Sequence, residues 1–431
     1  MGKQQFHLGW FAKFGPPAWQ AGEDRNYGAD WPNGRVYIDL AQRLERACFD
    51  FLLFEDTQTV STTFGGSMAL DLKHAFYSPK HDPLPLLSVL AAATRSIGFI
   101  GTASTTFYPP FLLARLFATL DGLSEGRIGW NVVTSSEANA ARNYGMEDLP
   151  SHEERYARAD EFIELTKSLW NSWEKNALLQ DEESGTYVDY TKVHTVNFKG
   201  QYYRSQGPLN TLRPPQGYPV IAQAGASARG KNLAAKYADV VVANTAGGVE
   251  GMKAKRDDIR ARAAGAGRNP DDSKVFFICS PVITESEEEG IPEPHFEYLL
   301  AMFSSFMDID LSVYDPDGPF PQDVTANGHT SVLEELKRHG AAGKTLRGAV
   351  VAHGMGADEF ELVGPAESIA EKMMQAMDEI GGDGFLINGP DLTSPAYIEG
   401  VTKGIVPVLQ KAGATRSTYT GKTLKEVLGE F

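Results

Sequence analysis

The chain has 431 residues, 42% of them hydrophobic, and a formal net charge of -16. This acidity opposes binding to phosphate backbones, and no stripe of lysine or arginine offsets it, so nucleic acid is not an expected partner. Its two cysteines, Cys48 and Cys279, have no ligand-like spacing, which argues against a disulfide framework and against a metal site.

From the N-terminus onward, the chain alternates short apolar runs with helical patterns. The first ten residues carry no signal region, and no stretch of about 18 apolar residues could span a membrane, so we expect a cytoplasmic protein without a membrane partner. Strands are predicted at 5–10, 51–55, 97–104, 127–134, 219–223, 239–243, 274–280 and 384–388. Helices are predicted at 36–48, 84–94, 112–123, 151–173, 228–237, 248–264 and 365–380. Eight strand-helix units favour an α/β fold, a closed (β/α)₈ TIM barrel, over an open sheet.

Two stretches exceed the minimal barrel, so we expect one domain over residues 1–431 with insertions at about 176–218 and 285–356. The first contains a predicted hairpin, residues 193–204, that turns at Lys199-Gly200. The second is either a lid or binding loop, as long insertions on barrels often are, or an oligomer contact or simple decoration.

The active site of such a barrel lies at the carboxyl ends of its strands, which selects candidates directly. Asp56 follows the apolar strand 51–55 and either meets a ligand at the barrel mouth or is an exposed loop acid. The segment Gln223–Gly230 joins a strand to a helix, and its small residues allow close approach of the backbone to a ligand. Ser227 sits at the N-cap position, so this turn either binds a phosphate or is an ordinary serine-capped turn.

A second helix start follows the fourth strand. Ser151 and Glu154 form the pattern of a capping box. His152 and Tyr156 are four residues apart and share one helical face, from which both could donate hydrogen bonds to a phosphate. The alternative is a surface histidine beside a packed tyrosine.

Other motifs are absent or incomplete. Residues 340–345 lack the leading glycine of a phosphate loop, residues 354–359 lack the third glycine of a dinucleotide fingerprint, and neither HExxH nor GxSxG occurs. An anion-binding barrel of this kind must carry a cofactor or bind a phosphorylated substrate.

Around the third and fourth strands the sequence resembles a known family. The tracts 102–110, 114–115, 118–121, 126–135 and 141–145 resemble the nitrilotriacetate monooxygenase component A family, a branch of the bacterial-luciferase-like, FMNH₂-dependent two-component monooxygenases. The resemblance continues through 152–156, 159–162, 169–173, 207–209, 223–225 and 406–410. Three tracts, 107–110, 192–194 and 207–209, look most like the dibenzothiophene-sulfone branch.

The resemblance implies a set of FMN contacts, carried over position by position. They are Asp56, Thr102, Asn131, His152, Tyr156 and the turn Gly225-Ala226-Ser227. Asn131 would lie under the isoalloxazine ring, and His152, Tyr156 and the turn would hold the phosphate. This phosphate would sit near the loops after the fourth and fifth strands, whereas barrels more often bind it after the seventh and eighth.

The implied reaction uses FMNH₂ and O₂ through a flavin peroxide, with the reduced flavin supplied by a separate NAD(P)H:flavin reductase. The resemblance also implies a homo-oligomer, a dimer or tetramer. No catalytic acid or base is assigned. An apolar substrate pocket is expected from Trp10, Phe11, Phe54, Phe107 and Val242. Because no arginine or lysine cluster is visible, a small aromatic or sulfur-containing substrate is favoured.

Three alternatives stay open at this point. One is an aminopolycarboxylate or amine monooxygenase of the same family. Another is an isomerase or aldolase acting on a phosphorylated metabolite, for which Glu55 would be the candidate catalytic residue. The third is a flavin-binding protein without turnover.

Overall fold

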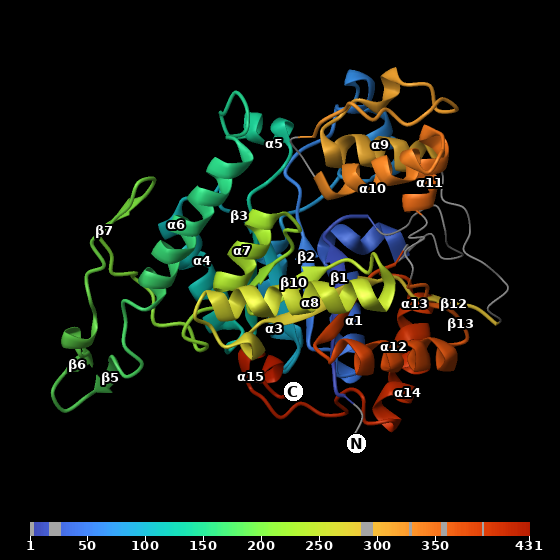
Figure 1. The fold of residues 1–431 in the computed structure, drawn as a ribbon. Coiled ribbons are helices and arrows are strands. Elements are labelled where there is room, and N and C mark those ends of the chain that lie inside the picture. The colour runs from blue at the N-terminus through green and yellow to red at the C-terminus, as the bar shows by residue number, and fades with distance from the viewer. Residues whose placement is uncertain (1–3, 17–26, 286–295, 327–329, 355–359, 390–391) are drawn as a thin grey trace.

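The computed structural model describes residues 4–16, 27–285, 296–326, 330–354, 360–389 and 392–431. At its centre eight parallel strands close into a barrel in the order β1-β14-β11-β10-β9-β4-β3-β2 (Figure 1). The strands are β1 (His7–Lys13), β2 (Phe51–Glu55), β3 (Gly98–Ser104), β4 (Ile128–Val133), β9 (Val220–Gln223), β10 (Val240–Ala243), β11 (Lys274–Cys279) and β14 (Gly384–Ile387). The predicted TIM barrel is therefore confirmed, with all eight strands.

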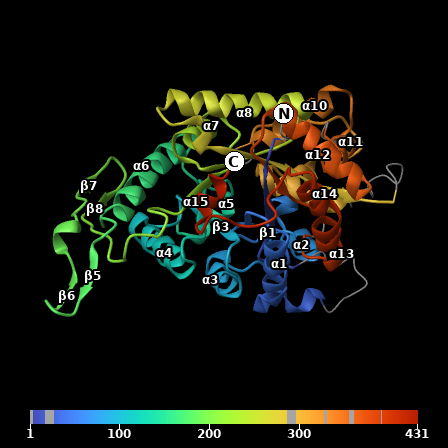
Figure 2. The ribbon, with the colours of Figure 1, turned by 90° about the horizontal axis from the view of Figure 1, so that it is seen from below.

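Helices surround this barrel, as the view along it shows (Figure 2). The seven predicted helices are α1 (Arg35–Arg46), α3 (Pro83–Ala93), α4 (Pro110–Leu123), α6 (His152–Trp170), α7 (Ala228–Tyr237), α8 (Gly248–Gly265) and α12 (Ala366–Ile380). Among the short helices that were not predicted are α2 (Ala69–His74), α5 (Ala138–Asn143), α13 (Pro395–Glu399) and α14 (Val406–Lys411). In the described part of the chain, none of the helices combines the length and the apolar character needed to cross a membrane.

Alternation of side chains along the strands divides the core into two layers. Inward-facing residues such as Phe51, Ile100 and Leu386 fill the barrel, while the larger cluster lies between the strands and the helices. Leu424 and Leu428 of the last helix, α15 (Leu424–Leu428), join the inner cluster and close the barrel at the amino ends of the strands. The opposite end, where the carboxyl ends of the strands meet, is the mouth.

The first insertion projects from the barrel as an arm, to the left in Figure 1. It holds two antiparallel hairpins, β5 (Leu178–Asp181) with β6 (Thr186–Val188), and β7 (Phe198–Lys199) with β8 (Arg204–Ser205). The second is the hairpin predicted at Lys199-Gly200, shorter than expected and with Phe198 paired to Ser205. The first hairpin was not predicted from the sequence.

The second insertion is helical and has a core of its own. It consists of α9 (Phe296–Met307), α10 (Thr330–Ala341) and α11 (Leu346–Gly354), and part of its predicted range, residues 286–295, 327–329 and 355–356, lies outside the described residues. Buried side chains such as Leu299, Leu336 and Leu346 form a cluster separate from the two layers of the barrel. At its base, β12 (Val282–Ile283) pairs with β13 (Val363–Gly364).

This insertion lies over the loop that follows β2. The Lys73 ammonium and the Glu297 carboxylate are 2.5 Å apart, and the hydroxyls of Ser61 and Ser305 share a buried hydrogen bond. The ring of Phe306 packs against those of Phe76 and Tyr77. The insertion is thereby held at the mouth side of the barrel.

Candidate active site at the barrel mouth

Two polar side chains meet on neighbouring strands at the mouth. Thr102 on β3 is paired in register with Asn131 on β4. The Asn131 amide nitrogen donates to the Thr102 hydroxyl at 2.8 Å, and this hydroxyl donates to the Phe54 carbonyl at 2.7 Å. Both side chains are buried, and Oδ1 of Asn131 has no hydrogen-bond partner among the described residues. A fixed, unpaired acceptor of this kind is suited to an N–H group of a bound ligand.

Asp56 lies one residue beyond the end of β2 and is partly buried. Its carboxylate accepts a hydrogen bond of 2.9 Å from the Gln58 amide. Burial raises the pKa of Asp56 to about 6, against the smaller opposing effects of Gln58 and Lys80. A carboxyl group with a raised pKa in a pocket is a frequent mark of a functional site. The alternative of a fully exposed loop acid does not apply.

Two helix starts come together beside these strands. Ser151 caps α6 by accepting the Glu154 backbone N–H at 3.3 Å, and Ser227 caps α7 by accepting the Gly230 N–H at 3.1 Å. The reciprocal half of the predicted capping box is absent, because Glu154 forms an ion pair with Arg158 instead. The first N–H groups of each helix have no intrahelical partner, and the positive ends of both helix dipoles favour an anion here.

Gly225 brings the two helix starts into contact. A Cβ built on Gly225 would lie 2.7 Å from the Tyr156 hydroxyl and 2.4 Å from the Gln223 amide nitrogen, so only glycine fits without displacement. Tyr156 is buried, and its ring centroid is 4.7 Å from that of His152. The structure thus gathers His152, Tyr156 and the Gly225-Ala226-Ser227 turn, which the sequence nominated from separate helices.

His152, Tyr156 and the Gly225-Ala226-Ser227 turn are here called the anion corner. Charged side chains surround it. Arg229, which the sequence analysis did not single out, lies 3.3 Å from Glu153 and 3.4 Å from Asp160. Its pairing with Glu153 limits the repulsion that this carboxylate would exert on an anion. The signal in the sequence that could have identified Arg229 is its position, as a positive residue, in the first turn of the serine-capped helix.

Gln223 was also missed as a candidate in its own right. Its side chain is buried, and its Oε1 has no hydrogen-bond partner in the part of the chain that the structure describes. Together with Oδ1 of Asn131, it leaves two unpaired buried acceptors at the ends of adjacent strands, because β4 pairs with β9. No sequence signal distinguishes an unpaired amide from a satisfied one.

The expected apolar pocket is only partly at the mouth. Phe11 and Val242 pack with the inner cluster and face the barrel interior. Trp10 and Phe54 are fully buried on the outer side of the wall, against Phe49 and Tyr37 respectively. The prediction that these two line a pocket must be corrected, because alternation along β1 and β2 turns both rings toward the surrounding helices.

Phe107 lies at the mouth, where its ring stacks on that of Tyr144 with centroids 4.4 Å apart. It shares a small pocket with several of the residues described above. That pocket is lined by Asp56, Thr57, Gln58, Thr102, Ser104, Phe107, Val133, Ser135, Glu137 and Ala140. The pocket therefore lies where the ends of β2, β3 and β4 meet, beside the stacked rings of Phe107 and Tyr144.

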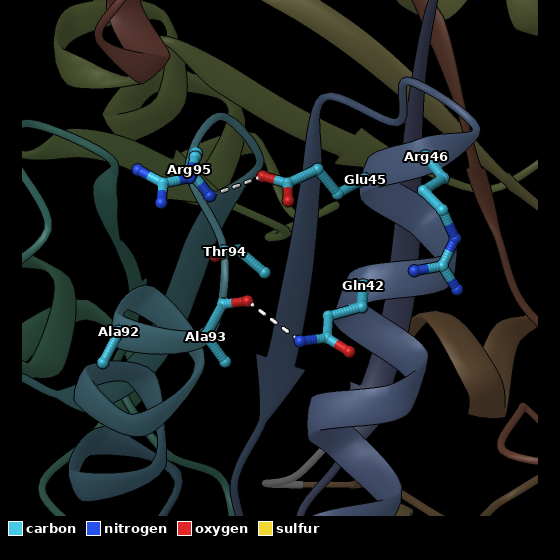
Figure 3. A pocket seen from close by; sticks show the side chains of 7 residues that line it. All are labelled: Gln42, Glu45, Arg46, Ala92, Ala93, Thr94 and Arg95. Atoms are coloured by element: carbon cyan, nitrogen blue, oxygen red, sulfur yellow. Dashed lines mark hydrogen bonds between the residues drawn. The ribbon is translucent and has the colours of Figure 1, made fainter.

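A larger surface hollow lies elsewhere, between the last turns of α1 and α3 (Figure 3). Its lining side chains hold these helices together, since the Glu45 carboxylate accepts the Arg95 N–H at 2.7 Å and the Gln42 amide donates to the Ala93 carbonyl at 3.1 Å. It is on the side of the amino ends of the strands, away from the mouth. We assign it to helix packing and not to chemistry.

Glu55, the candidate base of an isomerase, is not free. The Lys80 ammonium lies 2.6 and 2.8 Å from its two carboxylate oxygens. Among the described residues no group of three or more histidine, cysteine, aspartate or glutamate side chains is arranged to hold a metal ion. The mouth therefore offers an anion corner, unpaired amide acceptors and a partly buried carboxyl group.

The chain as a whole is similar to monooxygenases and to a riboflavin lyase in comparisons with known proteins. Dibenzothiophene-sulfone monooxygenase of Rhodococcus erythropolis (strain XP) is 36% identical over 99% of this chain and 97% of its own length. Nitrilotriacetate monooxygenase component A of Aminobacter aminovorans is 36% identical over 92% of this chain and 89% of its own length. The crystal structure of a riboflavin lyase with modified FMN and riboflavin superposes with a TM-score of 0.87 and 29% identity, covering 99% of this chain and 96% of that one.

The family model for luciferase-like monooxygenases matches residues 6–384. That range contains seven of the eight barrel strands, reaches the first residue of β14, and includes both helix starts of the anion corner. The resemblance found from the sequence motifs is thereby confirmed, and with it the general activity of an oxidoreductase that acts with reduced flavin. The chain belongs to the luciferase-like monooxygenase family.

Proposed function

We propose that this chain is the oxygenase component of a two-component system and that its cofactor is FMN, taken up as FMNH₂ from a separate NAD(P)H:flavin reductase. The observation that carries the choice of FMN is the corner where two capped helices meet at Gly225 beside the Tyr156 hydroxyl. A terminal phosphate distinguishes FMN from riboflavin, and such a corner is suited to a phosphate. When bound, reduced flavin would supply the activation of O₂.

The chain's own residues would bind and orient. His152, Tyr156 and the N–H groups of the Gly225–Ser227 turn would hold the phosphate. Oδ1 of Asn131, kept in place by Thr102, would accept from the ring system, with Asp56 at its edge. Helices α9–α11, anchored over the loop after β2, would shield the mouth from water.

For the substrate, we favour a small organic molecule with an aromatic or sulfur-containing part. Phe11, Val242 and Phe107 support this choice as apolar side chains toward the interior or the mouth. An amine or aminopolycarboxylate substrate is the second candidate, because a nitrilotriacetate monooxygenase is among the relatives. Membership of a monooxygenase family removes the isomerase and aldolase alternatives.

The protein is further proposed to be a homo-oligomer, a dimer or tetramer. The arm of the first insertion exposes several large apolar side chains, which supports a contact with another subunit. They are Leu178, Leu179, Tyr187 and Tyr190. The cytoplasmic location stays a prediction.

The two-component assignment predicts that the purified chain with NADH and FMN alone consumes no O₂ beyond the background. Addition of a flavin reductase should give O₂ uptake that rises with a substrate from a panel of aryl sulfides, sulfones and amines. Oxidised FMN should bind loosely and reduced FMN more tightly, because a diffusible cofactor must leave after each turnover. Substrate oxidation driven by NADH without a reductase would contradict the assignment.

The phosphate assignment predicts a selective effect of Tyr156→Phe. Loss of one charge-assisted hydrogen bond should weaken FMNH₂ binding by about tenfold to a hundredfold, since such bonds contribute roughly 1.5–3 kcal/mol. Anaerobic titration with reduced riboflavin, which lacks the phosphate, should give nearly unchanged affinity. Equal weakening of both flavins would instead mean that Tyr156 touches the ring or supports the fold.

A further inference from the structure

A second group of charged side chains lies at the mouth, on β1, β2 and the loop that follows β2. Lys13 is the last residue of β1 and is paired in register with Glu55, the last residue of β2. Phe11 faces the barrel interior, and Lys13, two residues later on the strand, faces the same side. Lys80 comes from the loop, and its ammonium bonds both oxygens of Glu55 and, at 2.5 Å, the Thr57 hydroxyl.

Only one of the two ammonium groups in this cluster is engaged in an ion pair among the described residues. Lys80 has a side chain that is only 5% exposed and is paired with Glu55. Lys13 is partly buried and has neither an ion pair nor a side-chain hydrogen bond within the described ranges. Of the other carboxylates nearby, Asp56 accepts from the Gln58 amide and Asp71 accepts backbone N–H groups of Ser61, Tyr77 and Ser78.

Burial lowers the pKa of Lys13, while Glu55 acts in the opposite direction. An ammonium group in such a place, without a close counter-ion, is unfavourable in a free protein and is stabilised when an anion binds.

A neutral donor belongs to the same cluster. Tyr77 is 4% exposed, and its hydroxyl has no hydrogen-bond partner among the residues that the structure describes. The Lys80 ammonium lies 5.5 Å from the centre of the Tyr77 ring. A buried hydroxyl without a partner, on a ring close to the Lys80 ammonium, is a second sign that a polar ligand group belongs here.

This cluster borders the proposed flavin contacts without overlapping them. Asp56 follows Glu55 directly, and the Phe54 carbonyl accepts from Thr102, which binds Asn131. The cluster therefore occupies the β1–β2 sector of the mouth, whereas the anion corner for the phosphate lies after β4 and β9. A substrate that reaches from the ring system toward β1 would meet Lys13.

We propose that the substrate carries an anionic group, a carboxylate, sulfonate or sulfinate, which binds to Lys13 with Lys80 beside it, while its apolar part lies toward Phe11 and Val242. This inference rests on the proposed function and specifies its substrate class. It revises the expectation from the sequence that no cationic cluster lies at the barrel mouth. Lys13 and Lys80 lie far apart in the chain, and only the fold brings both to Glu55.

The test uses the full chain and matched pairs of probes. Benzoate, 4-(methylthio)benzoate and benzenesulfonate are each titrated calorimetrically beside the corresponding neutral amide. At least one anion should bind about tenfold or more tightly than its amide. The variant Lys13→Met should lower the affinity for that anion by about tenfold to a hundredfold, the range of one charge-assisted bond, and leave the amide unchanged.

Lys13 is the informative position, because it is in no ion pair with any described residue and its replacement therefore does not leave a carboxylate without a partner. Lys13→Arg keeps the charge and should keep most of the preference for the anion. Lys253→Met removes a surface lysine that pairs with Asp257 on α8 and should change neither probe. Thermal unfolding of each variant establishes that the fold is intact.

Flavin binding separates this inference from the proposed function. Anaerobic titration should give the same FMNH₂ affinity for the wild type and for Lys13→Met. Absence of FMNH₂ binding by the wild type would remove the proposed function itself. If FMNH₂ binds but no anion exceeds its amide, or if Lys13→Met keeps the full preference, the anionic-substrate inference is wrong and the monooxygenase assignment is untouched.

Discussion

Replacement of Gly230 by alanine should weaken FMNH₂ binding by about a hundredfold or more, because at least two charge-assisted bonds to the phosphate would be lost. A Cβ on Gly230 would lie 2.8 Å from the carbonyl carbon and oxygen of Gly225, which are backbone atoms that cannot rotate away. The turn would have to open, and its N–H groups and the Tyr156 hydroxyl would no longer face one point.

Gly265→Ala is the matched control for this variant. A Cβ at Gly265, in the last turn of α8, meets no atom within 4 Å, so alanine there should be neutral or add up to about 1 kcal/mol of stability. Anaerobic flavin titration gives the affinities, and circular dichroism reports whether the barrel persists. An unchanged FMNH₂ affinity in folded Gly230→Ala would contradict the placement of the phosphate at this turn.

Asp50→Ala should lower the free energy of unfolding by about 3–5 kcal/mol, the effect expected when one partner of a buried ion pair is removed. Asp50 is 1% exposed, and its carboxylate lies 2.6 Å from the Arg416 guanidinium and 3.0 Å from His7. It also accepts the Leu8 backbone N–H at 2.7 Å. The substitution would leave Arg416, itself buried, with Glu430 as its one acidic partner among the described residues.

The effect of Asp50 should depend on pH. Burial alone would raise the pKa of this carboxyl group, but His7, Arg416 and the Leu8 N–H together hold it below its ordinary value. A lowered pKa in the folded state stabilises the protein above the unfolded-state pKa, about 3.9, and this contribution is lost as the pH falls through the folded-state pKa. The difference between wild type and Asp50→Ala should therefore be constant near neutrality and shrink below about pH 4.

Urea denaturation at several pH values measures this difference. Asp317→Ala is the control, because Asp317 is 73% exposed and pairs with Arg347 at the surface, where such pairs contribute under about 1 kcal/mol. Asp50 lies at the closed end of the barrel, so FMNH₂ affinity should not change in folded Asp50→Ala. Equal effects of the two substitutions would show that the buried network is not a stabilising unit.

The positions of strands and helices were predictable from the sequence, because local patterns decide them. Short apolar runs that are buried on both faces, followed by amphipathic stretches, gave all eight strands and the seven main helices to within a few residues. Ser151 and Ser227 cap their helices as predicted, since a cap depends on a side chain and on N–H groups two or three residues away. The family resemblance was equally readable, because its motifs are contiguous.

What each strand residue faces was decided by the tertiary structure. The sequence placed the end of the first strand at Trp10, whereas the strand continues to Lys13, and alternation then directs Trp10 outward and Lys13 toward the mouth. Where a strand ends depends on its pairing with neighbours, here with Glu55 on β2 and Ile387 on β14. If the end of a strand is assumed one or three residues too early, residues of the outer core are taken for residues of the pocket.

Which distant residues come together could likewise not be predicted from the sequence. Closure of the barrel places the Gly225 turn against Tyr156, Asn131 against Thr102, and Lys13 and Lys80 around Glu55. Each contact joins residues whose separation along the chain carries no periodic signal, because it is set by the packing of whole strands and helices. The sequence by itself determined the barrel, its family and the separate candidate residues, and only the packed structure decided which of them share a site.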